Sequence, residues 1–417
     1  MKRLYLLFAA VAVCGVRSAC GQSMTLAAYR DSVSSYSWQL KSAGASAAGA
    51  HETMCRSKSE MLPEISAAAS ASKSFHEMAG NRLWGFFIKP QVVQTVYGGG
   101  GLRAAYRKAE SDYRSALGDE QAARLDVRYA ADYAYWNVSA MQLFMSAAEE
   151  YVSIIESLYR VVERRFGEGY IAKSDLLQVE TRLSDAEYQL QTARRAYAEV
   201  LHAFNSQFGA ELDRAARLAE SITDTLPMPV RVTAGDMLSR RPDILAAAER
   251  VTAAEHAVDV TRAAYNPQVS IGAGGSWQTF TSPAAGRTYL DASLTMAVSV
   301  PIFRWGARRH AVSAASAAVR GTEYALASAR DAAAREEADG WSALTSSRAQ
   351  MFSSLRNLKI AGENLDISTY SYNEGQATIL DVLQAQLSWI QIYTNTITAQ
   401  FNYAVAVSAY KRITASD

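Results

Sequence analysis

The sequence predicts an α+β fold in which long antiparallel helical hairpins accompany four β-strands, arranged as two copies of one unit. Three observations support this prediction. The motif Glu168-Gly169 and its surroundings recur at Glu374-Gly375, 206 residues later (374 − 168) and without a gap. Two runs of about 65 residues contain no proline and are rich in residues that favour helices. Four further segments alternate between apolar and polar residues, as in a strand with one apolar face.

The chain begins with a segment typical of a secretory signal peptide, residues 1–21. Two basic residues precede an apolar run that is too short to span a bilayer, and small residues follow it. Cys20 leaves lipidation open, but Arg17 stands where a lipidation signal has an aliphatic residue. We therefore expect ordinary cleavage, after which Cys55 is the single cysteine and no disulfide framework exists.

We expect the remaining chain to form two structural repeats, residues 22–209 and 241–417, joined by a linker or equatorial region at 210–240. The first repeat is predicted to contain, in order, a helix, a β-hairpin at about 64–97, a long helix at about 102–165, a tip turn at 166–172 and a helix at 173–209. The second is predicted to contain a helix, a β-hairpin at about 267–303, a long helix at about 307–371, a tip turn at 372–377 and a helix at 378–413. A repeat of this length indicates gene duplication and a pseudo-symmetric fold.

The strand segments and the long helices must be explained together. In the second repeat Val269, Ile271 and Ala273 alternate with Ser270 and Gly272, and a soluble sandwich is the usual explanation for such strands. However, a helix of about 65 residues is on the order of 100 Å long, about three times the diameter of a small domain. Such a helix must pack against partner helices along its length.

Four strands in one chain also cannot close a barrel in a membrane, because about eight are needed. Open strand edges are not tolerated within the bilayer. If these strands span a membrane, several chains must therefore share one barrel. Aromatic residues near the strand ends, among them Trp84, Trp277 and Trp305, would then lie at the membrane interfaces.

Several classes of function are not supported by the sequence. The net charge of +1 gives no electrostatic reason to expect nucleic acid as a partner. The five histidines have no metal-binding spacing, HExxH and CxxC motifs are absent, and GGGGLR lacks the Lys-Ser/Thr of a phosphate-binding loop. No pair of carboxylates is set apart as acid and base. We predict neither an enzyme nor a cofactor or metal site.

The order of several short motifs resembles the TolC-like outer-membrane efflux proteins over nearly the whole mature chain. These motifs are LPEIS and NPQVS before the strands, GGGGLR and RWGARR before the long helices, and the EGY and EGQ turns. The stretch SRRPDILAAAERVTAAEHAVDVTRAAYNP is similar to the drug-efflux branch of the family. Each motif alone is weak, but their order and their repeated offset are specific.

The resemblance implies a homotrimer in the outer membrane, with a shared twelve-stranded β-barrel and an α-helical tunnel in the periplasm. The implied function is a passive exit duct for small molecules such as drugs. An inner-membrane pump, of resistance-nodulation-division type rather than ABC type, would deliver them through a periplasmic adaptor, or membrane-fusion, protein. The alternative is the outer-membrane channel of an ABC-driven type I protein secretion system. A more distant alternative is a periplasmic coiled-coil adaptor or structural rod.

The resemblance also assigns roles to particular residues. The adaptor would dock on the two tip turns, at Glu168, Gly169, Tyr170, Glu374, Gly375 and Gln376. The hinges between strand and helix would be Gly98, Gly99, Gly100, Gly101 and Gly306, and the prolines between helix and strand Pro63 and Pro267. The basic residues at these junctions, such as Arg103 and Arg309, we interpret as ordinary solvated helix charge rather than as contacts with lipid phosphates. The same interpretation applies to Arg164 and Arg165.

Two acidic residues just after the turns, Asp175 and Asp381, match the first acidic ring that constricts such tunnels and favours cations. For Asp175 we favour a helix-capping or helix-dipole role. For Asp381 the gate role and the capping role stay open and are compatible, since Thr378 three residues earlier fits a capping box. Gln384 stands where some relatives carry a second acid, so a double acidic gate is not expected. Ala377 lacks the basic residue that some members use to lock the closed state.

Overall fold

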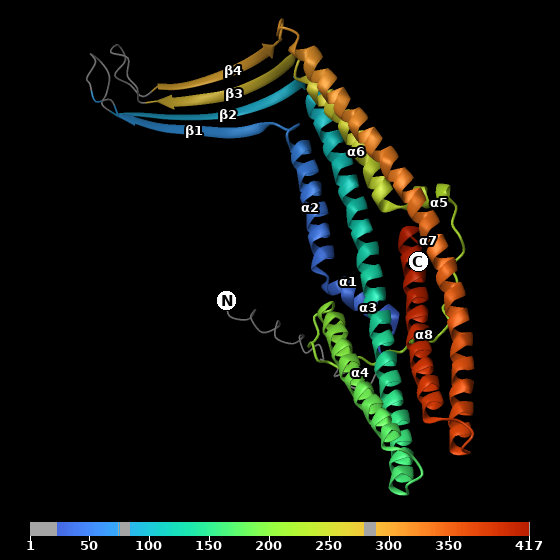
Figure 1. Cartoon of the computed structure of the whole chain (residues 1–417). Helices are drawn as coiled ribbons and strands as arrows, with labels where there is room; N and C mark the ends of the chain where they lie inside the picture. The colour runs from blue at the N-terminus through green and yellow to red at the C-terminus, as the bar shows by residue number, and fades with distance from the viewer. Residues whose placement is uncertain (1–22, 74, 76–83, 279–288, 417) are drawn as a thin grey trace, which may run out of the picture. The chain divides into compact units, whose positions relative to one another are not determined.

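The structure is a computed structural model that describes residues 23–73, 75, 84–278 and 289–416 (Figure 1). The predicted signal peptide and Cys20 lie outside the described residues. The described chain is rich in helix and contains four antiparallel strands, which confirms the predicted α+β fold class. None of its described helices combines the length and the apolar character that a membrane crossing requires.

The chain divides into two compact units. The tip unit comprises the residues up to Tyr36 together with Ala130–Pro227 and Ser347–Val405. The strand unit comprises Ser37–Tyr129, Met228–Ser346 and the residues from Ala406 onward. The strand unit holds the sheet, and the tip unit holds both predicted tip turns, so each predicted site can be described within one unit.

The four strands of the strand unit form one sheet in the order β1-β2-β3-β4 (Figure 1). They are β1 (Glu64–Lys73), β2 (Trp84–Gly98), β3 (Gln268–Gln278) and β4 (Tyr289–Ser299). Pairing of β2 with β3 joins the two hairpins, while β1 and β4 lie at the edges among the described residues. The second hairpin ends at Ser299 rather than near 303, and Pro301 follows, which has no N–H to donate to a ladder.

The apolar face of β4 is not covered by the described chain. Leu294, Met296 and Val298 recur at every second residue and are 79%, 69% and 59% exposed. A soluble antiparallel sheet normally packs such a face against a core. This sheet therefore requires an apolar environment outside the chain.

The first repeat contains two helices before its first strand, where one helix was expected. These are α1 (Leu26–Tyr36) and α2 (Trp38–Ser59). Ser37 leaves the helical conformation, with φ −49° and ψ 118°, and its side chain accepts a hydrogen bond from the amide of Leu40. Because serine is a favoured N-cap, it ends one helix and starts the next without proline or glycine.

The remaining helices follow the predicted order with small shifts of their ends. They are α3 (Gly101–Gly167), α4 (Lys173–Ser206), α5 (Ala234–Arg240), α6 (Pro242–Ala263), α7 (Ala307–Asn373) and α8 (Ile379–Ile413). Both α3 and α7 have 67 residues, and each begins and ends 206 residues from its counterpart (307 − 101 and 373 − 167). The short helix α5 lies inside the region predicted as linker, where Thr233 caps it by accepting from the amide of Asp236.

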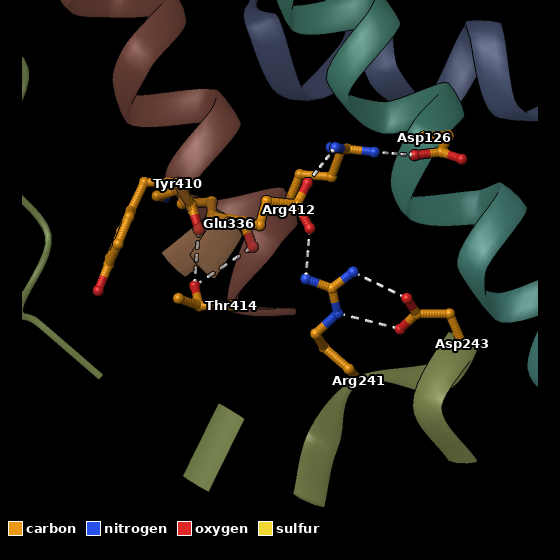
Figure 2. A network of polar contacts seen from close by, with 8 residues as sticks. Asp126, Arg241, Asp243, Glu336, Tyr410, Arg412 and Thr414 are labelled. Carbon is orange, nitrogen blue, oxygen red and sulfur yellow. Dashed lines mark hydrogen bonds and ion pairs between the residues drawn. The ribbon is translucent and has the colours of Figure 1, made fainter. Parts of the chain in front are cut away.

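A polar network ties the start of α6 to α3, α7 and α8 within the strand unit (Figure 2). Arg241 forms two hydrogen bonds with Asp243, at 3.0 and 2.8 Å, and a third with Glu336 at 2.6 Å. Glu336 also accepts from Arg412, whose other nitrogen donates to Asp126. Burial alone would raise the pKa of Asp243, but the hydrogen bond and charge of Arg241 lower it. The RRPD stretch therefore serves as a structural junction.

Aromatic residues form the core of the tip unit around α1. Tyr29 stacks on Phe204 with ring centroids 4.1 Å apart, and the hydroxyl of Tyr29 donates to the carbonyl of Phe204 at 3.0 Å. Burial raises the pKa of Tyr29. At the end of this region Gly209 has φ +74°, and a Cβ there would lie 2.5 Å from the ring of Tyr36. The site demands glycine for both its conformation and its space.

Candidate docking and gate site at the tip turns

The two tip turns have the same backbone structure. In the first, Gly169 has φ +79°, its amide donates to the carbonyl of Phe166, and the amide of Tyr170 donates to that of Arg165. In the second, Gly375 has φ +75°, its amide donates to the carbonyl of Tyr372, and the amide of Gln376 donates to the carbonyl of Ser371. This is the Schellman motif, in which a left-handed residue ends the helix and satisfies its last carbonyls. The repeated glycine is therefore a requirement of the turn.

Both turns are exposed. Tyr170 is 77% exposed, and Glu168, Glu374 and Gln376 are also exposed. A Cβ at either Gly169 or Gly375 would meet nothing within 4 Å. The conformation, rather than lack of space, thus explains these glycines, and each turn offers a free surface in the described chain.

The second turn begins its outgoing helix with a complete capping box. Thr378 Oγ1 accepts from the amide of Asp381 at 3.3 Å, while Asp381 Oδ2 accepts from the amide and the hydroxyl of Thr378 at 2.9 and 2.7 Å. These bonds from the Thr378 hydroxyl and amide lower the pKa of Asp381. Asp381 is exposed, so its charge is available beyond the cap.

The first turn lacks this cap. Ala172, the counterpart of Thr378, is the N-cap of α4 and provides no side-chain hydrogen bond. Asp175 lies in the first turn of α4, where a carboxylate suits the helix dipole. Its Oδ1 accepts from the hydroxyl of Ser174 at 3.3 Å, and the side chain is half-buried. The two acidic residues are equivalent in sequence, but only Asp381 takes part in a capping box.

Arg165 joins the two turns. Its guanidinium donates to the carbonyls of Tyr372 and Asn373 at 3.4 and 3.1 Å, and it lies over the ring of Tyr372 at 4.8 Å. Those carbonyls belong to the last turn of α7, where a cation is favourable. The interpretation of Arg165 from the sequence, as an ordinary solvated charge, is therefore wrong. Its counterpart in the second repeat is Ser371, which cannot make the reciprocal contact.

A cavity of about 330 Å³ lies between α4 and α8, just past the turns. Gln384 lines it together with its repeat counterpart Gln178. The remaining lining residues are Thr181, Arg182, Asp185, Leu380 and Leu383. Gln384, which stands where some relatives carry a second acid, thus places a neutral side chain at a cavity lined by both polar and apolar residues.

The predicted hinges lie at the other end of the long helices, in the strand unit. Gly98 ends β2, Gly99 and Gly100 have φ +65° and +88°, and Gly101 begins α3. Gly306, with φ +80°, directly precedes α7. The two predicted prolines, Pro63 and Pro267, stand one residue before β1 and β3. None of these residues is near the tip turns in sequence.

The contact of Arg165 and the cavity between α4 and α8 were not found by sequence reasoning. Both depend on how turns 206 residues apart lie together within the tip unit. One signal was available for Arg165, because a basic residue in the last turn of a helix often binds carbonyls. That signal does not identify a second helix as the acceptor.

Comparison with known proteins gives the same assignment over both repeats. Residues 31–209 and 233–415 match the family described as outer membrane efflux protein. Protein CyaE of Bordetella pertussis is 27% identical over 78% of this chain and 70% of its own length. The pyoverdine export outer membrane protein OpmQ of Pseudomonas aeruginosa is 27% identical over 69% of this chain and 60% of its own length.

A solved structure has the same fold. VceC, an outer membrane protein of Vibrio cholerae, superposes with a TM-score of 0.78, over 94% of this chain and 96% of VceC, at 20% identity. At that identity the likeness establishes the fold alone. The family match assigns the chain to the outer membrane as a channel protein and not an enzyme. The chain belongs to the outer membrane efflux protein family.

Proposed function

We propose that three copies of this chain form the exit duct of a tripartite efflux pump, which passively exports small molecules through the outer membrane. The sheet carries this proposal. Among the described residues β1 and β4 each pair on one side only, and the apolar face of β4 is exposed. An open edge within a bilayer must be paired, and four strands are too few for a closed barrel. Three chains supply twelve strands, which close the ring.

The efflux role is supported by the relatives' names. OpmQ is named for pyoverdine export, and a relative from Pseudomonas putida, TtgC, for a toluene efflux pump. Both names denote small-molecule export. Secretion of a protein by an ABC-driven system remains the alternative outcome of the experiment below.

The tip turns are the proposed docking site for a periplasmic adaptor. They are exposed, they repeat one backbone motif, and each carries an acidic residue, Glu168 or Glu374. In a trimer they would supply six similar turns around the tunnel mouth. Asp381, exposed and held as a carboxylate by Thr378, is the proposed cation-selective residue of the gate.

A photo-crosslinking amino acid at Gln376 tests this assignment in cells. The control carries it at Tyr324, another exposed position, earlier in α7. Capture of an adaptor encoded with a proton-driven pump at Gln376, and not at Tyr324, is the expected result. An adaptor of an ABC system would instead assign the channel to protein secretion. Capture of no adaptor at Gln376 would remove the tips as the docking site.

A further inference from the structure

The two junctions between strand and helix have the same backbone but opposite surroundings. The first junction, residues 96–104, contains Gly99 and Gly100 at φ +65° and +88°. The second junction, residues 302–310, has Trp305 and Gly306 at the equivalent positions, at φ +46° and +80°. Trp305 thus has the left-handed conformation that glycine, Gly99, has at the equivalent position of the first junction. For a bulky side chain this conformation is unusual and invites a functional explanation.

The first junction is filled by the chain itself. Gly99 is buried, and a Cβ there would lie 2.6 Å from the carbonyl oxygen of Ala263. The side chain of Asn266 also donates to the Gly99 carbonyl at 2.9 Å. No room remains for another molecule beside this glycine.

The second junction is open. Ile302, Phe303 and Trp305 are 93%, 69% and 88% exposed, and the two aromatic rings meet edge to face with centroids 4.8 Å apart. The exposed apolar face of β4 leads directly into this cluster. The strained tryptophan gains no burial from the described chain, so its partner lies outside the chain.

The second junction is also strongly basic. Arg304, Arg308 and Arg309 are all exposed, and no acidic residue occurs in the sequence between Asp291 and Glu323. In the described chain Arg308 and Arg309 form no ion pair, while Arg304 lies over the ring of Tyr265. Near the first junction Arg103 and Arg107 also form no ion pair in the described chain, but Lys108 is paired with Asp112 at 2.7 Å and Glu110 lies in the same helix turn. Arg308 and Arg309 are therefore free to bind an anion.

We propose that the second junction binds the headgroup of an anionic phospholipid in the periplasmic leaflet of the outer membrane. Arg308 and Arg309 hold the phosphate, because exposed arginines near a bilayer attract anionic headgroups. For Arg309 this proposal replaces the interpretation from the sequence as ordinary solvated charge. Phe303 and Trp305 occupy the boundary between headgroups and acyl chains, which aromatic residues prefer. The assignment rests on the proposed function, since it requires the strands to lie in the bilayer.

Native mass spectrometry of the purified full-length assembly in detergent tests this site. Phosphatidylglycerol and phosphatidylcholine are titrated separately, and retained lipid is counted per assembly. The variant R304Q/R308Q/R309Q should bind phosphatidylglycerol at least about tenfold more weakly than the natural protein, with phosphatidylcholine unchanged. The control R103Q/R107Q/K108Q removes the same three charges from the first junction and its next turn, and should retain phosphatidylglycerol.

Equal phosphatidylglycerol binding by both triple variants and the natural protein would overturn the proposal. A second variant, Trp305→Ala, separates lipid from protein as the partner. We expect it to weaken phosphatidylglycerol binding and leave the oligomeric mass unchanged. A smaller assembly with unchanged lipid binding would assign Trp305 to contact with a second copy and overturn the proposal. A monomer that still prefers phosphatidylglycerol would keep the site and refute only the proposed trimer.

Discussion

The two tip turns differ in their side chains although their backbones agree. Each ends its long helix with a Schellman motif around a left-handed glycine, Gly169 or Gly375. The second turn then has a capping box at Thr378 and receives the guanidinium of Arg165 from the first. The first turn supplies this guanidinium, but it has no capping box and receives no such contact in return. The two turns therefore share a backbone motif that satisfies the last carbonyls of the helix, while their polar side-chain contacts differ.

This difference predicts that the second turn is the more rigid of the two. Its incoming helix is held by Arg165 and its outgoing helix by Thr378. The outgoing helix of the first turn, α4, begins without a side-chain cap at Ala172. An adaptor that docks on both turns would therefore meet one fixed and one more adaptable surface.

The largest effect is expected for Gly375→Val. A β-branched residue in the left-handed region costs about 1–2 kcal/mol, and the turn must change its conformation to avoid this cost. We expect export, measured as drug accumulation in cells, to be lost while the oligomer still forms on native gels. The same substitution at Gly169 strains the first turn equally.

Asparagine tolerates the left-handed conformation, so Gly375→Asn is the control and should keep export. Normal export by the valine variant would show that the shape of the second turn is not needed for docking. Loss of export for Gly375→Val but not for Gly169→Val would restrict docking to the more rigid turn.

The capping difference is tested by removing the threonine N-cap from the second turn and introducing one in the first. Thr378→Ala removes a cap worth about 1 kcal/mol, which corresponds to about fivefold faster hydrogen exchange in the first turn of α8. Ala172→Thr creates the same Thr-x-x-Asp spacing with Asp175 and should slow exchange at the start of α4. Hydrogen exchange of peptides from both turns measures the two effects. If Ala172→Thr leaves α4 unchanged, the turns differ by more than this cap.

The regular elements could be predicted because they follow from local patterns. Period-two alternation marked the strands, and long runs without proline marked α3 and α7 within about two residues at each end. The break at Ser37 was missed, since a serine inside a helical run does not show whether its side chain will cap the following turn.

The polar contacts at the tip turns likewise divide into local ones, which could be predicted, and long-range ones, which could not. The capping box of Thr378 and Asp381 spans three residues and could be predicted from spacing alone. The contact of Arg165 with Asn373 links residues 208 positions apart and depends on packing within the tip unit. No local pattern encodes such a contact, and the cavity beside Gln384 was missed for the same reason.

A smaller effect is expected for Arg165→Gln. The substitution removes the contact over Tyr372, an interaction worth about 0.5–1 kcal/mol at an exposed site, and both bonds to the carbonyls at the end of α7. Hydrogen exchange in residues 372–378 should become faster by a few-fold at most. Arg164 precedes it, is exposed and belongs to the same helix turn, so Arg164→Gln is the matched control. Equal effects of both substitutions would show that the loss of one positive charge, and not of the specific contacts of Arg165, speeds the exchange.

The last prediction concerns the charge of Asp381, not the stability of its turn. Hydrogen bonds from Thr378 lower the pKa of this carboxyl, so they favour its ionised form. The capping contribution is therefore complete above the pKa of about 3.9 of a free aspartate and is lost as the pH falls through the lowered value. Thr378→Ala removes the hydroxyl that donates to this carboxylate, so Asp381 should lose its charge at a higher pH than in the natural protein. Reversal potentials across a bilayer in a KCl gradient, recorded from pH 7 downward, follow the charge directly.

Asp381→Asn removes the carboxylate at every pH, and we expect it to reduce the cation preference of the channel while the oligomer still forms. Asp175→Asn is the control from the other turn, and it should change the preference less, because Asp175 is half-buried and makes no capping box. If the cation preference of Asp381→Asn equals that of the natural channel, Asp381 acts only as a cap. In that case the second turn differs from the first in rigidity alone, and the selectivity of the tunnel mouth arises from other residues.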